Sequence, residues 1–249
     1  MKPFIIIVGL FRSGTTLAQE LLTQKDVSFI FHEPRFFEMG WQFQNYDKKY
    51  LAEKWGLTFP NKFLSTAEVW KYFMEDLGLQ IGVKEIRNAA THAYYEAWGG
   101  NARLLVIDRD AVEIYKSCYK MFMRNNAQFH WRPMFQPLSP INVYREVKTE
   151  LKNINNLWNM FHPLCKAVVN YHELINKNFH QRIYDFLESD ITDPEIGEYH
   201  SILPRGQYET DLHKGKVTDR AIGLSETPNI IKDQARKFSN LLAGNKAWV

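Results

Sequence analysis

Residues 4–22 read FIIIVGLFRSGTTLAQELL, and this stretch decides the fold that the sequence predicts. The apolar run at 4–8 is typical of a buried strand, and the residues from Leu17 onward favour a helix. Gly9 and Gly14 bound the loop between them, where glycine lets the backbone curl so that successive N–H groups face one concavity. The following helix adds the positive end of its dipole. The sequence therefore predicts a strand, a phosphate-binding loop and a helix in succession.

The loop departs from the usual ATP-binding pattern at one position. Its spacing fits the frame G-x-x-x-x-G-K-[ST], but Thr15 stands where the lysine that reaches the β- and γ-phosphates is required. The cation that the loop does carry is Arg12. The loop is therefore not expected to serve an ordinary ATPase.

The composition is that of a folded domain, because 45% of the 249 residues are hydrophobic and 24% are charged. A chain of this length commonly forms one α/β domain, so we expect residues 1–249 to be a single domain. The net charge of +3 is too small to predict a nucleic-acid partner. It is compatible with a local basic pocket that binds a small polyanion.

The first apolar run stops after Leu10 and has no small-residue cleavage pattern behind it, which disfavours a signal peptide. No apolar stretch is long enough to cross a bilayer. Cys118 and Cys165 have neither the number nor the spacing of a disulfide framework. We therefore expect a cytoplasmic protein without a membrane span.

Short apolar strands alternate with helical segments along the chain. Strands are expected at 4–8, 27–31, 79–84, 104–108 and 166–170, and helices at 91–98, 111–124 and 141–161. This alternation predicts an α/β fold with a central parallel sheet of about five strands flanked by helices on both faces. We expect short helices and loops over one mouth of the sheet at 36–70, and a loop at 190–215.

Charged residues follow several of these strands. Ligands of open parallel sheets bind beyond the carboxyl ends of the strands. The residues that fall there are Arg12, Glu33, Lys84 and Arg109. We expect the tertiary fold to bring them together.

The loop Gly9-x-x-Arg12-Ser13-Gly14-Thr15-Thr16 resembles the 5'-phosphosulfate loop of the sulfotransferases that use 3'-phosphoadenosine 5'-phosphosulfate (PAPS). The resemblance implies a P-loop-type three-layer fold and PAPS as the co-substrate, with 3'-phosphoadenosine 5'-phosphate (PAP) as its product. It also implies the residues of the loop that hold the phosphosulfate: Arg12, Ser13, Gly14, Thr15 and Thr16.

A second segment supports the resemblance. Arg109 follows the strand at 104–108, and Ser117 lies eight residues later, about two helical turns away. A guanidinium and a hydroxyl placed in this way can bind one phosphate from two sides. The segment is similar to the 3'-phosphate motif of the same sulfotransferases. The alternative is a surface ion pair between Arg109 and a nearby acid, namely Asp108, Asp110 or Glu113.

Two further segments resemble the family more loosely. Residues 213–216, HKGK, are similar to its Arg-Lys-Gly loop, so the resemblance implies that Lys214 and Gly215 bind the donor. His213 replaces the leading arginine, and a solvated basic run is the alternative interpretation. Residues 168–175, VVNYHELI, resemble a strand followed by a Tyr-Glu-Asp-Leu turn, for which we expect a structural role.

Sulfuryl transfer requires an activated acceptor oxygen and stabilisation of the charge that develops on the leaving phosphate. Arg12 is the expected electrophilic stabiliser. In the family, the cytosolic members that act on small molecules use a histidine in a Lys-Thr-His segment after the third strand as the base, but residues 84–86 are Lys-Glu-Ile here. Many carbohydrate and tyrosyl-protein members use a glutamate after the second strand instead, and Glu33 matches that arrangement. Glu33 is therefore the predicted base, with Glu85 as the second candidate.

The alternative role for Glu33 is structural, either as a partner of Arg35 or as the cap of a helix after Pro34. His32 and His130 are interpreted as polar packing residues. The eight histidines are scattered and no metal-ligand motif occurs, so no metal site is expected.

Aromatic side chains are frequent at 36–63, and this segment and residues 125–137 are expected to line the acceptor site. Aromatic faces suit sugar rings, so a carbohydrate or another small molecule is the expected acceptor. Two other functions remain open. A P-loop nucleotide kinase would need an acid such as Asp108 for Mg²⁺, and a non-catalytic nucleotide-binding protein would bind PAP without transferring sulfate.

Overall fold

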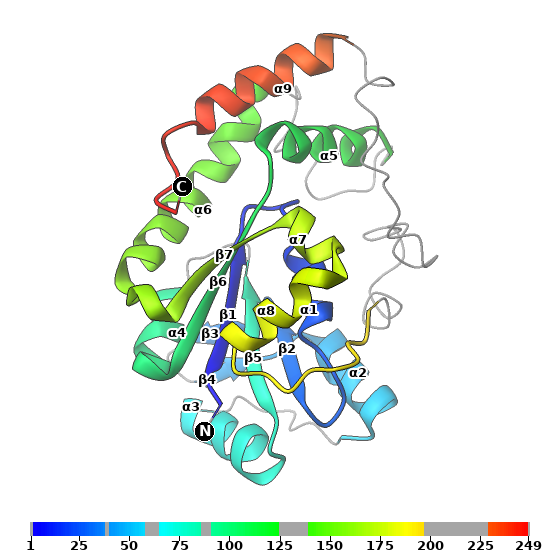
Figure 1. Cartoon of the computed structure of the whole chain (residues 1–249), viewed down its shortest axis with the longest axis vertical. Helices are drawn as coiled ribbons and strands as arrows, with labels where there is room; N and C mark the ends of the chain where they lie inside the picture. The colour runs from blue at the N-terminus through cyan, green and yellow to red at the C-terminus, as the bar shows by residue number, and fades with distance from the viewer. Residues whose placement is uncertain are drawn as a thin grey trace.

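The computed structural model describes residues 2–37, 40–57, 65–85, 91–124, 139–196 and 229–248. Its centre is a five-stranded sheet with the strand order β2-β5-β1-β6-β7, in which all neighbouring strands are parallel (Figure 1). The strands are β1 (Phe4–Gly9), β2 (Ser28–His32), β5 (Gln80–Glu85), β6 (Ala102–Asp108) and β7 (Lys166–Asn170). The predicted α/β fold with a parallel sheet of about five strands is confirmed.

Strand β1 lies in the middle of the sheet because its sequence is apolar on both faces. All six of its residues are buried. Successive side chains of a strand point to opposite faces, and Phe4, Ile6 and Val8 accordingly belong to one hydrophobic cluster. Ile5 and Ile7 belong to the other cluster. A continuous apolar run therefore builds a core on each side of the sheet.

Helices cover both faces, as predicted. One face is packed by α1 (Thr15–Leu21), α7 (Tyr171–Ile175) and α8 (His180–Phe186), which appear in front of the sheet in Figure 1. The core on the other face includes residues of α2 (Asn45–Trp55), α3 (Thr66–Val69), the π-helix Trp70–Asp76, α4 (Thr91–Trp98), α5 (Ala111–Arg124), α6 (Pro140–Met160) and α9 (Asn229–Leu242). Short 3₁₀ turns occupy Gly99–Asn101, Pro163–Cys165 and Lys177–Phe179.

The segment at 36–70 contains the predicted short helices, but its start is different. Residues after Pro34 form a β-hairpin of β3 (Arg35–Phe37) and β4 (Gly40–Gln42), paired antiparallel with Phe36 opposite Trp41. The hypothesis that Glu33 caps a helix at this point is therefore wrong. The physical reason is the strong preference of phenylalanine and tryptophan for extended backbone.

Helix α9 was not foreseen from the sequence. It packs on α5, where the Tyr115 hydroxyl donates a hydrogen bond to Oε1 of Gln234 at 3.0 Å. In Figure 1 both helices lie at the top of the view, and the N-terminal end of β1 lies at the bottom. Within the described residues, no helix is both long and apolar enough to span a membrane.

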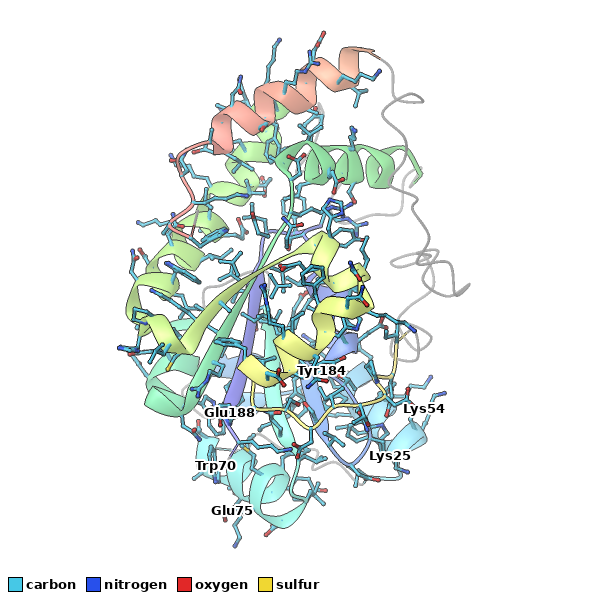
Figure 2. All side chains as sticks on the ribbon, in the orientation of Figure 1. Lys25, Lys54, Trp70, Glu75, Tyr184 and Glu188 are labelled. Atoms are coloured by element: carbon cyan, nitrogen blue, oxygen red, sulfur yellow. The ribbon has the colours of Figure 1, made fainter. Side chains whose placement is uncertain are left out.

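The connection after α8 returns along the sheet and is fixed by Glu195. Its carboxylate accepts hydrogen bonds from the Tyr50 hydroxyl, from Trp55 Nε1 at 3.1 Å and from the Lys25 backbone N–H at 2.6 Å. The Glu195 N–H donates to the Thr23 carbonyl at 2.9 Å. Figure 2 shows Lys25 and Lys54, a residue of α2, at the corner of the molecule that this connection reaches. One carboxylate therefore joins three chain segments.

We predict that Glu195→Ala lowers the free energy of unfolding by about 1–3 kcal/mol, because Trp55 and Tyr50 lose a charged acceptor. Urea denaturation measures this change. The matched control is Glu53→Ala, since Glu53 is exposed on α2 and forms a surface pair with Lys49 at 3.9 Å. The control should stay within about 0.5 kcal/mol of the unmodified chain. Equal effects of the two substitutions would contradict the anchoring role.

Candidate functional site

The candidate site lies at the carboxyl ends of β1 and β6, which are neighbours in the sheet. The chain leaves β1 through α1 toward β2 at one edge, and it leaves β6 through α5 and α6 toward β7 at the other edge. Adjacent strands whose connections diverge in this way open a crevice where ligands of parallel sheets bind. The loop after β1 carries Arg12, and Arg109 follows β6.

The two predicted anion-binding segments meet at this point. Nε of Arg12 donates a hydrogen bond to Oγ of Ser117 at 3.0 Å, although 105 positions separate the two residues. Nη1 of Arg109 donates to the backbone carbonyl of Arg12 at 3.1 Å. Two guanidinium groups and one hydroxyl are thus held within a single contact network.

The loop has the backbone that close approach of an anion requires. A Cβ on Gly9 would lie 2.4 Å from Ser13 Oγ and 2.8 Å from the Ile107 carbonyl oxygen, so only glycine fits there. Gly14 has a φ of 107° and precedes α1, and its N-cap position offers no side-chain acceptor to the first turn. The N–H groups at this helix start therefore remain available to a bound anion.

Two side chains of the loop add to this cradle. Ser13 is only 1% exposed, and its hydroxyl oxygen has no hydrogen-bond partner within the described residues. A buried hydroxyl without a partner is unfavourable, and a phosphate oxygen would accept its hydrogen bond. Thr15, the next hydroxyl, is also buried. The residues of the loop therefore fit an anionic group such as a phosphosulfate.

Arg12 and Glu33 both have the left-handed backbone that residues other than glycine seldom adopt, with φ values of 68° and 46°. Each such residue costs on the order of 1–3 kcal/mol, and strain of this kind is concentrated at functional sites. The two residues that the sequence indicated for catalysis are therefore both held in an unfavourable conformation by their surroundings.

Three acidic residues lie close to Arg109 in the sequence, and only one of them contacts it. Glu113 Oε2 accepts from Arg109 Nε at 3.0 Å. Asp108 is bound instead by the Lys246 ammonium at 2.6 Å, and Asp110 accepts backbone N–H groups at the start of α5. The ion-pair interpretation of Arg109 is thus correct for Glu113. A different nitrogen of the same guanidinium, Nη1, donates to the backbone carbonyl of Arg12 in the loop.

Two further neighbours of the arginines are not carboxylates. The guanidinium of Arg109 stacks over the ring of Tyr171 at 4.0 Å. Burial raises the pKa of the Cys118 thiol to about 12, although Arg12 and Arg109 act in the opposite direction. The thiol is therefore neutral at physiological pH and does not neutralise either guanidinium.

Glu33 lies at the carboxyl end of β2 and is paired with a buried lysine. Its Oε1 accepts from Nζ of Lys84 at 2.5 Å, and the Lys84 side chain is 1% exposed whereas that of Glu33 is 27% exposed. The Glu33 N–H also donates to the Lys84 carbonyl at 2.8 Å. Gln44 donates to the Glu33 carbonyl at 2.8 Å. Backbone and side-chain contacts thus fix the direction of this carboxylate.

Glu85, the second candidate base, follows Lys84 on β5 and is 6% exposed. An acceptor hydroxyl therefore reaches Glu33 more readily than Glu85. Several predicted site residues lie outside the part of the chain that the structure describes. They are the Arg35 side chain, residues 125–137 with His130, and the segment with Lys214 and Gly215. In the described part of the chain, no group of three or more histidine, cysteine or acidic side chains is placed to hold a metal ion.

No protein-family model matches the chain, and no curated protein matches it. Solved structures do match. A sulfotransferase domain from the curacin biosynthetic pathway aligns over 82% of this chain and 78% of its own, with a TM-score of 0.54 and 15% identity. The chain has the sulfotransferase fold. The sulfotransferase domain of the Synechococcus PCC 7002 olefin synthase aligns over 94% and 87%, with a TM-score of 0.50 and 16% identity.

At such identities the sulfotransferase fold is common to the proteins while most side chains differ. The likeness therefore establishes the arrangement of the sheet and helices. The function must be argued from the residues of the site itself.

We predict that Gly14→Ala lowers the free energy of unfolding by about 1–3 kcal/mol. The substitution places a Cβ 2.5 Å from the Tyr171 ring, at a residue whose φ is 107°. The control is Gly100→Ala, because a Cβ on Gly100 meets nothing within 4 Å. Urea denaturation compares the two variants. A Gly14 variant as stable as the Gly100 variant would exclude this packing of the loop against Tyr171.

Proposed function

We propose that this protein transfers a sulfuryl group from PAPS to a hydroxyl of a carbohydrate or another small molecule. The observation that supports this function best is the contact of Arg12 with Ser117 and Arg109 beyond the ends of β1 and β6. Two anion-binding segments in contact suit a nucleotide with phosphates at both its 5' and 3' positions. An ordinary nucleoside triphosphate needs only the first.

In this proposal the loop binds the 5'-phosphosulfate through its N–H groups and its side chains, namely Arg12, Ser13, Thr15 and Thr16, with Gly14 allowing close approach. Arg109 and Ser117 bind the 3'-phosphate, and Lys214 with Gly215 completes that part of the site. The hydrogen bond between Arg12 and Ser117 gives way when the donor enters, because each group then has a phosphate or sulfuryl oxygen as its partner.

The transfer itself needs one proton acceptor and one electrophile. Glu33 accepts the proton of the acceptor hydroxyl as its oxygen forms a bond to sulfur. The bond between sulfur and the bridging oxygen of the 5'-phosphate breaks, and PAP leaves with the electron pair. Arg12 stabilises the negative charge that grows on the leaving phosphate. Binding the two substrates in line further lowers the activation free energy, because the reacting atoms are already oriented.

The kinase alternative is disfavoured by two residues. Thr15 stands in place of the lysine that a P-loop kinase requires. Asp108, the acid suggested for Mg²⁺, is bound by the Lys246 ammonium at 2.6 Å. A metal ion would have to displace this cation. A purely nucleotide-binding role is disfavoured because it would not explain a strained, lysine-paired Glu33 at the same edge of the sheet.

We predict that the protein binds PAP more tightly than ADP, and that Arg109→Ala weakens PAP binding about 10- to 100-fold. The loss of a charged hydrogen bond to the 3'-phosphate is the physical reason. Isothermal titration calorimetry measures both affinities. Arg236→Ala is the control, because Arg236 is 77% exposed on α9 and forms a surface pair with Asp233 at 3.8 Å. Equal affinity for PAP and ADP would exclude the proposed donor.

We predict that Glu33→Gln lowers kcat by about 10²- to 10⁴-fold and changes the Kd for PAP by less than about 3-fold. The amide keeps the size of the side chain but cannot accept the proton. Transfer of labelled sulfuryl from PAPS to a panel of sugars and phenols measures the rate, with Glu53→Gln as the control. A normal rate for the Glu33 variant would remove it as the base.

A further inference from the structure

A chain of buried polar side chains runs from α1 through β2 to Glu33. Gln19 of α1 is fully buried, and its Nε2 donates to the Ile30 carbonyl at 2.9 Å. Its Oε1 lies 2.8 Å from Nδ1 of His32, which is 3% exposed. On the other side of the ring, Nε2 of His32 lies 3.4 Å from Nζ of Lys84. The same ammonium contacts Glu33.

The chemistry of these contacts fixes the direction of each hydrogen bond. Because the Gln19 amide nitrogen donates to a backbone carbonyl, the Gln19 oxygen faces His32 and can only accept. Nδ1 of His32 must therefore carry the proton. In a neutral ring Nε2 is then an acceptor, and the Lys84 ammonium donates to it.

Helix α2 holds the histidine from a third side. The backbone N–H of His32 donates to the Asp47 carboxylate, with Oδ2 at 3.2 Å, and Asp47 is fully buried. The ring of Tyr46 meets the imidazole edge to face, with centroids 5.2 Å apart. The β2–β5 pairing places His32 directly opposite Lys84. The imidazole therefore has little freedom to turn away from the ammonium.

The geometry points to His32 as a positioning residue for the proposed transfer: held by Gln19 as the neutral Nδ1–H tautomer, it fixes the Lys84 ammonium against Oε1 of Glu33. This role rests on the proposed function, in which Glu33 is the base. Nothing in the sequence or in the sulfotransferase fold assigns a role to His32 or Gln19.

The arrangement suits a carboxylate in which one oxygen is fixed by the protein and the other accepts the proton of the acceptor hydroxyl. Lys84 occupies Oε1 of Glu33, and Oε2 has no hydrogen-bond partner in the described part of the chain. Oε2 is thus left for the acceptor hydroxyl. Among the described residues, two charged groups lie close to Nε2 of His32, namely the Lys84 ammonium at 3.4 Å and Oε1 of Glu33 at 3.5 Å, while Asp47 accepts from the His32 backbone N–H. A second proton on His32 would place a cation 3.4 Å from the ammonium and remove the acceptor that holds it.

The tautomer is tested directly by ¹⁵N NMR of histidine-labelled protein at pH 7, with the His32 signals assigned from their loss in His32→Asn. We expect a protonated Nδ1 and an unprotonated Nε2, and a change in the Nε2 shift in Lys84→Met. A protonated Nε2, or no response to Lys84→Met, would overturn the proposal. This measurement does not depend on any enzymatic activity, so it also decides the case if the protein transfers no sulfuryl group.

The kinetic test distinguishes the contribution of Nδ1 of His32 from that of Nε2. Asparagine reproduces the Nδ1 side of histidine and its contact with Gln19, but it does not reach Lys84, whereas glutamine places an amide oxygen near the Nε2 position. We expect His32→Asn to lower kcat about 10- to 100-fold with the Kd for PAP unchanged, and His32→Gln to recover most of the rate. His180→Asn is the matched control, because His180 lies outside the candidate site and its Nε2 contacts the Leu174 carbonyl on α7, at 2.8 Å.

Coupling to Lys84 is the decisive comparison. In a Lys84→Met background, His32→Asn should change kcat less than about 2-fold, because the group it positions is already gone. Independent effects of the two substitutions, or a loss of PAP binding in His32→Asn, would show that His32 only supports the fold. An inactive unmodified chain that still shows the expected NMR signals would instead reject the proposed function and leave the positioning of Lys84 established.

Discussion

The parallel pairing of β1 with β6 is the constraint on which the rest of the site depends. It sets Gly9 opposite Ile107, so the loop after one strand and the arginine after the other begin at the same edge. The pairing tolerates no side chain at Gly9, since a Cβ there would meet the Ile107 carbonyl oxygen at 2.8 Å. Through this register, Arg12 and Ser117 form a hydrogen bond although they are 105 positions apart.

Around this junction the protein balances charge so that positive groups remain for a ligand. Lys246 forms an ion pair with Asp108. Glu113 accepts a hydrogen bond from Nε of Arg109, and Nη1 of the same arginine donates to the loop. The buried Cys118 thiol stays neutral, because its pKa is raised to about 12. A few kilocalories per mole of backbone strain at Arg12 and Glu33 are maintained by these surroundings. Such an arrangement suits the proposed anionic donor better than a metal-dependent phosphoryl transfer.

The elements that could be predicted from the sequence are those whose residues follow a simple local pattern. The strands of the parallel sheet contain short apolar runs, and helix α6 repeats its buried residues every three or four positions, with Ser139 as its N-cap. The hairpin of β3 and β4 was missed because its aromatic residues show no sustained period. Helix α9 was missed although its buried residues, Ile231, Ala235, Phe238 and Leu242, recur every three or four positions as those of α6 do.

The amino-acid sequence alone determined the strand, loop and helix at 4–22, with Arg12 in place of a P-loop lysine, and the spacing of Arg109 and Ser117. Short-range patterns suffice for these features, because glycine conformations and helix periodicity are local. Only the tertiary structure decided which partners each side chain has: Lys84 and His32 for Glu33, Gln19 for His32, and Lys246 for Asp108. These pairs are formed by strand register and helix packing between distant segments. A one-residue change of register of β2 or β5 would turn His32 or Lys84 to the other face of the sheet.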